Sequence, residues 1–437
     1  MAVGYYAKKH GIPFTIYEAS NQVGGNCSTF KRGEFLFDSG AHRFHDKNPQ
    51  VTQEILGLMK EDILKISVPS QIYHQGRFID FPLSPLDLMK KLGFVTFTKS
   101  GLDFLWARLQ RGPIDNFERF AIHQYGKEMA SRFLLNYSTK LWGLPCAQLS
   151  IEVSGKRMKG LDLKTFVKET LLGEKAKTEH LDGTFYYPRY GYGMITQKLA
   201  DVCGYDNIRL NSRITKIRHR QGRIQEVELN NEQEQKCERV INTLPLSLFL
   251  KIMEPAPPED IQRIARSMKF RHVLLAAIML NKPSITGNGS VYFPDDEFPF
   301  TRVYEPKNRS KYMAPENKTS LMVEIPCAYD DAVWTMEEQK LLEIVKEKFK
   351  KIGWIEEKDV LDAAVYRLHN AYPVLELGFE EKIASVTGYL STFPNLHLSG
   401  RGGKFVYTWL HDMIQFGKDI IEDILDESKE RLQTEPV

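Results

Sequence analysis

Apolar and polar positions along the chain follow two spacings, which predict strands and helices in mixed order. Short apolar runs rich in β-branched and aromatic residues predict buried strands, and apolar spacings of three and four predict helices. Strands are expected at 12–17, 239–245, 273–280 and 395–399. Helices are expected at 2–10, 51–59, 85–92, 117–135, 193–202 and 335–351. The last helix has Thr335 and Glu338 at the spacing of a capping box. Elements of both kinds, interleaved along the chain, predict an α/β protein.

One stretch near the amino terminus carries the clearest chemical signal. The strand at 12–17 ends at Glu18, and Gly24 and Gly25 follow it. An acidic residue at the carboxyl end of the second strand of a βαβ unit accepts hydrogen bonds from the ribose hydroxyls of a dinucleotide. Glycines let the backbone turn closely past a ligand. The stretch therefore predicts a dinucleotide site, preceded by the helix at 2–10.

The first strand of such a unit and its Gly-x-Gly-x-x-Gly loop are not found in the sequence. The chain begins at Met1, where the helix that follows this loop is already expected. We expect that the reading frame starts upstream and that roughly 25 further residues hold the strand and the glycine loop. The alternative is a remnant whose dinucleotide binding is weakened, because the loop supplies the amide donors for the two phosphates.

Glu18 followed by Gly24-Gly25 resembles the E-x(5)-GG signature of FAD-dependent oxidoreductases of the amine oxidase and protoporphyrinogen oxidase type. This superfamily also holds the flavin-dependent UDP-galactopyranose mutases. The stretch 396–417 resembles the closing FAD motif, in which a strand leads into Gly-Arg, here Gly400-Arg401, and then into a helix. The resemblance implies an α/β fold with a Rossmann-like FAD-binding domain, a mixed-sheet substrate domain and a helical cap. The first strand and the glycine loop of the FAD-binding domain would be missing.

The resemblance also implies that the chain returns repeatedly to the same domains. The FAD-binding domain is expected from 1–70, 185–254 and 390–437. The helical cap with the first part of the substrate domain is expected at 71–184, and the second part at 255–389. FAD is therefore the expected cofactor.

The resemblance assigns cofactor contacts to residues from all three parts of the FAD-binding domain. They are Glu18, Gly24, Gly25, Asn26, Gly40, Ala41, His42, Ile214, Gly400, Arg401, Tyr407 and Asp412. Catalytic contacts are expected from His42, Arg302 and Tyr372. Without the resemblance, His42 would simply hydrogen-bond the backbone of a loop and Arg302 would be a surface arginine, so both alternatives stay open.

Length, charge and cysteines narrow the class of protein. The 437 residues suffice for two or three domains of ~100 to 200 residues each. The net charge of +3 gives no reason to expect a nucleic-acid partner. The five cysteines lack disulfide or metal-site spacing, which fits a reducing cytoplasm and predicts no metal centre. The longest apolar run, 273–280, is far shorter than the ~20 residues of a membrane span, and a membrane-surface association stays open.

Three functions follow from this interpretation. The first is an oxidoreductase in which hydride passes from a C–N or C–C bond of the substrate to flavin N5. The second is a flavin-dependent isomerase of the UDP-galactopyranose mutase type, suggested by 40–45, 136–143 and 301–305. The third is the remnant described above. The expected substrate is a small molecule, namely an amine, a porphyrinogen-like compound or a nucleotide sugar, and the oligomeric state is open.

Overall fold

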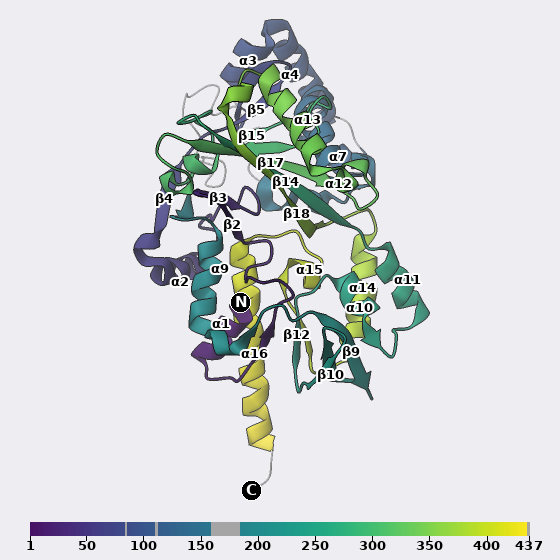
Figure 1. The fold of residues 1–437 in the computed structure, drawn as a ribbon. Coiled ribbons are helices and arrows are strands. Elements are labelled where there is room, and N and C mark those ends of the chain that lie inside the picture. Colours follow the sequence, from purple (N-terminus) through teal and green to yellow (C-terminus); the bar gives the residue numbers. More distant parts are fainter. Residues whose placement is uncertain (84, 110–111, 159–183, 435–437) are drawn as a thin grey trace.

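The computed structural model describes residues 1–83, 85–109, 112–158 and 184–434. Two lobes are stacked along the long axis of the molecule, with both chain ends in the same lobe (Figure 1). The lobe that holds the termini contains the long helix α16 (Leu410–Thr434), and the other lobe contains a seven-stranded sheet and the cap helices. The mixed α/β class expected from the sequence is confirmed.

The terminal lobe holds two short parallel strand pairs surrounded by helices. Strand β1 (Ile16–Tyr17) pairs with β8 (Ile208–Arg209), and β12 (Val240–Asn242) pairs with β19 (Leu396–Leu398). Helix α1 (Ala2–Lys9) packs between α9 (Gly193–Cys203) and α16. The predicted strand at 12–17 is shorter than expected, because Pro13 has no amide hydrogen for a strand ladder.

A four-stranded meander extends this lobe. Its strands lie in the order β11-β10-β9-β13 and comprise β9 (Ile214–Arg220), β10 (Arg223–Leu229), β11 (Gln233–Lys236) and β13 (Met253–Glu254). Gln221 and Gly222 form the tight turn between β9 and β10, both with positive φ (52° and 70°).

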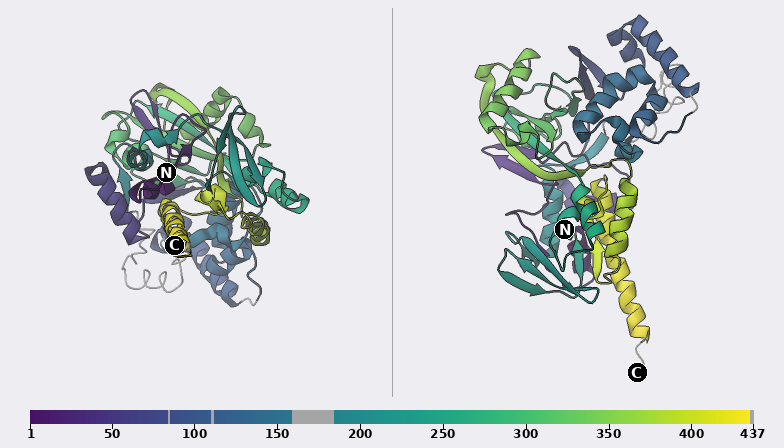
Figure 2. Two further views of the ribbon diagram at one scale, coloured as in Figure 1. Left: turned by 90° about the horizontal axis from the view of Figure 1, so that it is seen from below. Right: turned by 90° about the vertical axis from the view of Figure 1, so that its right-hand side faces the viewer.

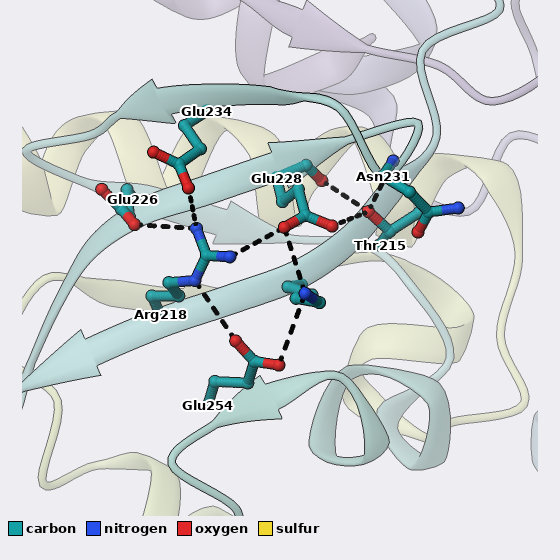
Figure 3. A network of polar contacts seen from close by, with 8 residues as sticks. Thr215, Arg218, Glu226, Glu228, Asn231, Glu234 and Glu254 are labelled. Carbon is teal, nitrogen blue, oxygen red and sulfur yellow. Dashed lines mark hydrogen bonds and ion pairs between the residues drawn. The ribbon is translucent and has the colours of Figure 1, made fainter.

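The guanidinium of Arg218 joins all four strands of the meander through the carboxylates of Glu226, Glu228, Glu234 and Glu254, at 2.5 to 3.2 Å (Figure 3). One cation that bridges four carboxylates holds the strands in register.

The sheet of the second lobe is mixed. Its order is β18-β14-β17-β16-β15-β5-β6, and only the β15–β5 pair is parallel. The strands are β5 (Ser70–His74), β6 (Arg77–Phe81), β14 (Phe270–Leu280), β15 (Ser290–Tyr292), β16 (Arg302–Tyr304), β17 (Thr319–Cys327) and β18 (Val360–Pro373). Helix α13 (Glu338–Lys351) packs on it through the buried side chains of Leu341, Val345 and Phe349.

The capping box predicted for α13 is wrong. The helix begins at Glu338, and Thr335 belongs to a separate short turn, α12 (Ala332–Thr335). The carboxylate of Glu338 accepts a hydrogen bond from the amide of Val365 at 2.8 Å. This tertiary contact replaces the local one that the spacing suggested.

The cap consists of α3 (Pro85–Leu92), α4 (Phe94–Leu109), α5 (Phe117–Tyr125), α6 (Lys127–Ala130) and α7 (Asn136–Trp142). The long helix predicted at 117–135 is broken at Gly126, whose φ is 76°. A Cβ atom there would lie 2.9 Å from the backbone of Phe104, so α4 and the start of α6 approach more closely than a side chain would allow.

The remaining elements connect the lobes or cover their edges. They are β2 (Thr29–Arg32), β3 (Phe35–Asp38), α2 (Pro49–Met59), β4 (Ile63–Ser67), β7 (Thr184–Pro188), α10 (Leu246–Lys251), α11 (Glu259–Ser267), α14 (Phe379–Leu390) and α15 (Gly400–Lys404). Among the described residues, no helix combines the length and the apolar character needed to cross a bilayer.

Candidate active site

One cavity of about 1750 Å³ runs from the terminal lobe to the cap. Thirteen of the residues predicted from the sequence line it: Glu18, Gly24, Gly25, Asn26, Gly40, Ala41, His42, Ile214, Arg302, Tyr372, Gly400, Arg401 and Tyr407. The fold therefore brings residues from opposite ends of the chain to one space. Pockets for drug-sized ligands occupy about 300 to 1,000 Å³, so this cavity leaves room for a dinucleotide and a substrate together.

Glu18 marks the end of the cavity in the terminal lobe. It follows β1 directly, and its Oε1 accepts hydrogen bonds from the amide and the hydroxyl of Ser20, each at 2.8 Å. These two bonds fix the carboxylate in place through one oxygen. The arrangement suits hydrogen bonds from ribose hydroxyls to the second oxygen.

Gly25 has the backbone that a close ligand contact requires. Its φ is +53°, and a Cβ atom built on it would meet no atom within 4 Å. Gly24 is different, because a Cβ atom there would lie 2.8 Å from the carbonyl oxygen of Cys27. Gly24 therefore permits the turn itself, and Gly25 keeps the cavity open in front of it.

The loop after β3 carries Gly40, Ala41 and His42 into the cavity. The amide of Ala41 donates to the carboxylate of Glu324 at 2.7 Å, and the carbonyl oxygen of His42 accepts from the buried guanidinium of Arg309 at 2.8 Å. Gly40 has a φ of +152°. Two buried charged side chains thus fix the loop from behind.

His42 is held as a neutral imidazole. Its ring stacks on Tyr192 with centroids 4.8 Å apart, and its Nε2 lies 3.3 Å from the hydroxyl of Ser39. Burial, together with the guanidinium groups of Arg401, Arg309 and Arg302, lowers the pKa of His42 to about 3. At neutral pH this residue offers hydrogen bonds and a flat surface, and no charge.

Arg302 reaches the cavity from β16 with its charge compensated. Its Nε donates to Oε2 of Glu324 at 2.8 Å, and its Nη2 lies 2.9 and 2.6 Å from the two carboxylate oxygens. The two residues are direct cross-strand neighbours on β16 and β17. The alternative of a surface arginine is therefore wrong, since the side chain of Arg302 is only 16% exposed.

Aromatic rings form the wall of the cavity beside Arg302. Trp142 lies edge-to-face with Tyr372 and with Tyr407, at centroid distances of 6.2 and 5.1 Å, and the two tyrosines are 5.7 Å apart. Burial is the main cause that raises the pKa of Tyr372 to about 12. The three rings make a rigid apolar surface, and Tyr372 keeps its hydroxyl proton at neutral pH.

The Gly-Arg turn lies where β19 meets α15. Gly400 has a φ of +75°, and the guanidinium of Arg401 donates to the carbonyl oxygens of Thr408 (2.7 Å) and Ala371 (3.3 Å). Arg401 thereby ties the turn to the end of β18.

Asp412, the remaining predicted cofactor contact, does not line the cavity. Its carboxylate accepts from the hydroxyl of Thr408 and from the amide of Trp409, at the start of α16. Asp412 is the third residue of α16, and its bond to the amide of Trp409, just before the helix, is one half of a capping box.

The sequence of this chain matches a known protein family. Residues 1–400 match the family of flavin-containing amine oxidoreductases. The chain belongs to this family. The coproporphyrinogen III oxidase of Bacillus subtilis (strain 168) is 20% identical, with 97% of this chain and 95% of the relative covered.

Two solved structures have the same fold as this flavin oxidoreductase. The crystal structure of reduced UDP-galactopyranose mutase has a TM-score of 0.84 at 20% identity, and covers 97% of this chain and 93% of its own. A putative protoporphyrinogen oxidase from Exiguobacterium sp. 255-15 has a TM-score of 0.76 at 17% identity, with 98% and 96% covered. The predictions of an FAD-dependent oxidoreductase and of its superfamily are confirmed.

The residues of this flavin oxidoreductase fit the cofactor. Gly25 leaves open space over a left-handed backbone, Glu18 presents a fixed carboxylate, and both lie on the same cavity as His42 and Tyr407. Residues Glu18, Gly25 and Ile214 would hold the nucleotide part, and the loop at Gly40 with the turn at Gly400 would border the ring system. Bound FAD would supply a hydride acceptor at this place.

Sequence reasoning missed two buried residues that hold the site, Glu324 and Arg309, which support the Gly40 loop as described. Asp38 also holds the site, since it accepts hydrogen bonds from Thr29 and from the amide of Tyr192. One signal was available: Glu324 is the sole charged residue of the apolar run 321–325, and charged residues are almost never fully buried without a partner. Nothing in the local sequence around Arg309 marks it as buried.

Proposed function

We propose that this flavin oxidoreductase removes hydride from a C–N or C–C bond of a largely apolar substrate. The observation that carries the proposal is the wall of Trp142, Tyr372 and Tyr407 beside two groups that carry no net charge, His42 and the Arg302–Glu324 pair. The uncharged part of an amine or of a porphyrinogen-like substrate fits such a wall, because desolvating a charged group there would go uncompensated.

The cap side of the cavity supports an apolar substrate. Its lining includes Phe81, Leu83, Leu88, Phe97, Phe104, Phe133, Leu134 and Leu141. These side chains exclude water from the space next to the aromatic wall. Water exclusion strengthens the few polar contacts that orient a substrate.

The residues of the chain have separate roles in this proposal. Tyr372, whose hydroxyl stays protonated, donates a hydrogen bond that orients the substrate. Neutral His42 lies flat against Tyr192 and shapes the cavity without repelling a cationic intermediate. Arg302 and Glu324 together present a dipole, because their opposite charges are only 2.6 Å apart at closest approach.

A UDP-sugar isomerase is the second candidate, as the sequence suggested. Residues from all three of its segments line the cavity, for example Gly40, Tyr137 and Arg302. The carboxylate of Glu324 argues against it, since it compensates the charge of Arg302 and would repel a diphosphate beside it.

Anaerobic titration of the FAD-loaded protein tests the proposal. Candidate amines and porphyrinogen-like compounds should bleach the oxidised flavin spectrum, and air should restore it. Conversion of a UDP-sugar only after dithionite reduction, with no oxidant consumed, would instead support the isomerase. If no such compound bleaches the flavin, the hydride-transfer proposal fails.

We also infer a cytoplasmic location. All five cysteines are unpaired in the structure, which suits a reducing compartment. Fractionation of cells into cytosol, membrane and periplasm or organelles tests this location.

A further inference from the structure

Helix α4 has apolar side chains on both of its faces. The inner face packs into the cap, and Phe97, Ser100 and Phe104 line the cavity. The outer face carries six large apolar side chains that are 56% to 79% exposed, namely Phe94, Val95, Leu102, Leu105, Trp106 and Leu109. Single exposed apolar residues are common on protein surfaces, but six within one helix of 16 residues mark a candidate interaction surface.

The six side chains form one stripe. On a helix with 3.6 residues per turn they fall within an arc of about 120°. Lys99 and Arg108 are exposed and lie just outside the two edges of this arc. The exposed Lys90, near the end of α3, adds a third basic group close to the start of α4.

Acidic residues near the stripe are turned inward. Between residues 87 and 109 the two carboxylates belong to Asp87 and Asp103. Asp103 accepts a hydrogen bond from the amide of Glu128 at 2.7 Å, and Asp87 forms an ion pair with Lys91 at 3.0 Å. The exposed charge that residues 87–109 themselves contribute is therefore positive.

The place of α4 in the molecule makes the stripe accessible to a flat surface. Helices α3 and α4 lie at the end of the molecule opposite to the C-terminus (Figures 1 and 2). In the right-hand view of Figure 2, the blue cap helices project beyond the sheet.

We propose that the outer stripe of α4 docks this protein on an anionic membrane surface. A helix that lies in the interface buries apolar and tryptophan side chains at the headgroup boundary, while basic residues at its edges contact anionic lipids. A second copy fits less well. A twofold interface would place the Lys99 and Arg108 side chains of both copies on the same patch, with no exposed carboxylate from residues 87–109 to neutralise them.

Docking through α4 would also place the cavity next to the lipid. The inner face of this helix lines the cavity, so only one helix separates the apolar cap space from the membrane. This consequence rests on the proposed function: an apolar substrate that partitions into lipid would be available at the cap. The docking itself does not depend on which substrate is oxidised.

Vesicle flotation of the full-length, FAD-loaded protein tests the docking. Vesicles of phosphatidylcholine with phosphatidylglycerol, 3:1, are compared with pure phosphatidylcholine. We expect flotation with the anionic vesicles, and a partition coefficient that falls at least ~10-fold for the double variant Leu102→Gln, Leu105→Gln. The double variant Lys99→Glu, Arg108→Glu should lose the preference for anionic lipid.

Controls keep the result specific to the stripe. Leu361 is an exposed leucine on β18, outside the cap, so Leu361→Gln should float like the wild type. All substituted side chains are exposed, so thermal unfolding should be unchanged. The tryptophan fluorescence emission maximum of the wild type should shift to shorter wavelength when vesicles are added. This shift should be lost in Trp106→Gln.

Two outcomes would overturn the proposal. One is that the wild type and the double leucine variant show the same flotation, whether both float or neither does. The other is that the wild type fails to float and sediments without lipid as a dimer that the leucine variant dissociates, which would make the stripe a subunit interface. Neither outcome bears on hydride transfer, which flavin bleaching measures in the absence of vesicles.

Discussion

Glu324 holds the guanidinium of Arg302 and the backbone amide of Ala41 with the same carboxylate, at 2.6 to 2.9 Å. The central sheet and the loop that borders the cavity are thereby joined by one side chain. Both partners are largely buried, with side-chain exposures of 16% for Arg302 and 6% for Glu324. The position of the Gly40 loop thus depends on a charge that is 283 residues away from Ala41 in the sequence.

Glu324→Gln is expected to destabilise the protein strongly. The substitution leaves the buried guanidinium of Arg302 without a countercharge, and breaking a buried pair in this way typically costs about 3 to 5 kcal/mol. Urea unfolding measures the loss. Asp426→Asn is the control, because its ion pair with Lys429 is highly exposed on both sides and should contribute little. Equal stability of the two variants would contradict the structural role of Glu324.

Gly25→Ala is expected to weaken FAD binding far more than it weakens the fold. A left-handed alanine costs about 1 kcal/mol, and its methyl group would project into the cavity where the cofactor is expected. Gly33→Ala is a close match: its φ is +59° against +53°, its Cβ also meets nothing within 4 Å, and Gly33 does not line the cavity.

The comparison of these two glycine variants separates strain from ligand contact. Both should lose similar stability in urea without cofactor. Only Gly25→Ala should lower FAD affinity, by at least ~10-fold, in a fluorescence titration. Similar FAD affinities for the two variants would remove Gly25 from the cofactor site.

Tyr372→Phe is expected to lower kcat/KM by roughly 10-fold, which is the usual value of one orienting hydrogen bond. Burial raises the pKa of Tyr372 to about 12, so its hydroxyl stays protonated below pH 10. The profile of kcat/KM between pH 6 and 10 should therefore have the same shape in Tyr372→Phe and in the wild type. The rings remain, so the stability should be close to that of wild type. An altered pH profile would point to a proton-transfer role instead.

Patterns with local causes were predicted well from the sequence. The spacing of apolar residues located α2, α3 and β14. The helix break at Gly126 was missed because its cause is the approach of α4, which no local pattern records. The domain boundaries at 70, 184, 254 and 389 stay a prediction.

The candidate site residues also divide into those with a local cause in the sequence and those whose position depends on distant parts of the chain. Glycines and the acidic residue after β1 could be located because their function depends on backbone shape and on position relative to a strand. Asp412 lies off the cavity and bonds the amide of Trp409, so its expected cofactor contact stays a prediction. Arg302 lines the cavity, and its catalytic role stays a prediction. Its partner Glu324 was not expected, because cross-strand pairing of β16 with β17 joins positions 22 residues apart.

The neutral state of His42 predicts how stability depends on pH. Burial and nearby guanidinium groups lower its pKa in the folded protein to about 3, while the unfolded chain retains the ordinary value of 6.5. Between these values the unfolded state binds the proton and the folded state does not, so this group makes stability fall as pH decreases from 6.5. The slope is at most about 1.4 kcal/mol per pH unit. In His42→Gln this contribution is absent, and the variant should lose less stability than the wild type on acidification.

Urea unfolding of both apoproteins at pH 7.5, 6.5, 5.5 and 4.5 measures the difference. Other titrating groups are common to the two proteins and cancel when the free energies of unfolding are subtracted. The subtracted value should be constant above pH 6.5, where the imidazole is neutral in both states, and should move in favour of His42→Gln below it. A constant difference over the whole range would mean that the folded protein accommodates a charged His42, and the imidazole would then be available as an acid in the cavity.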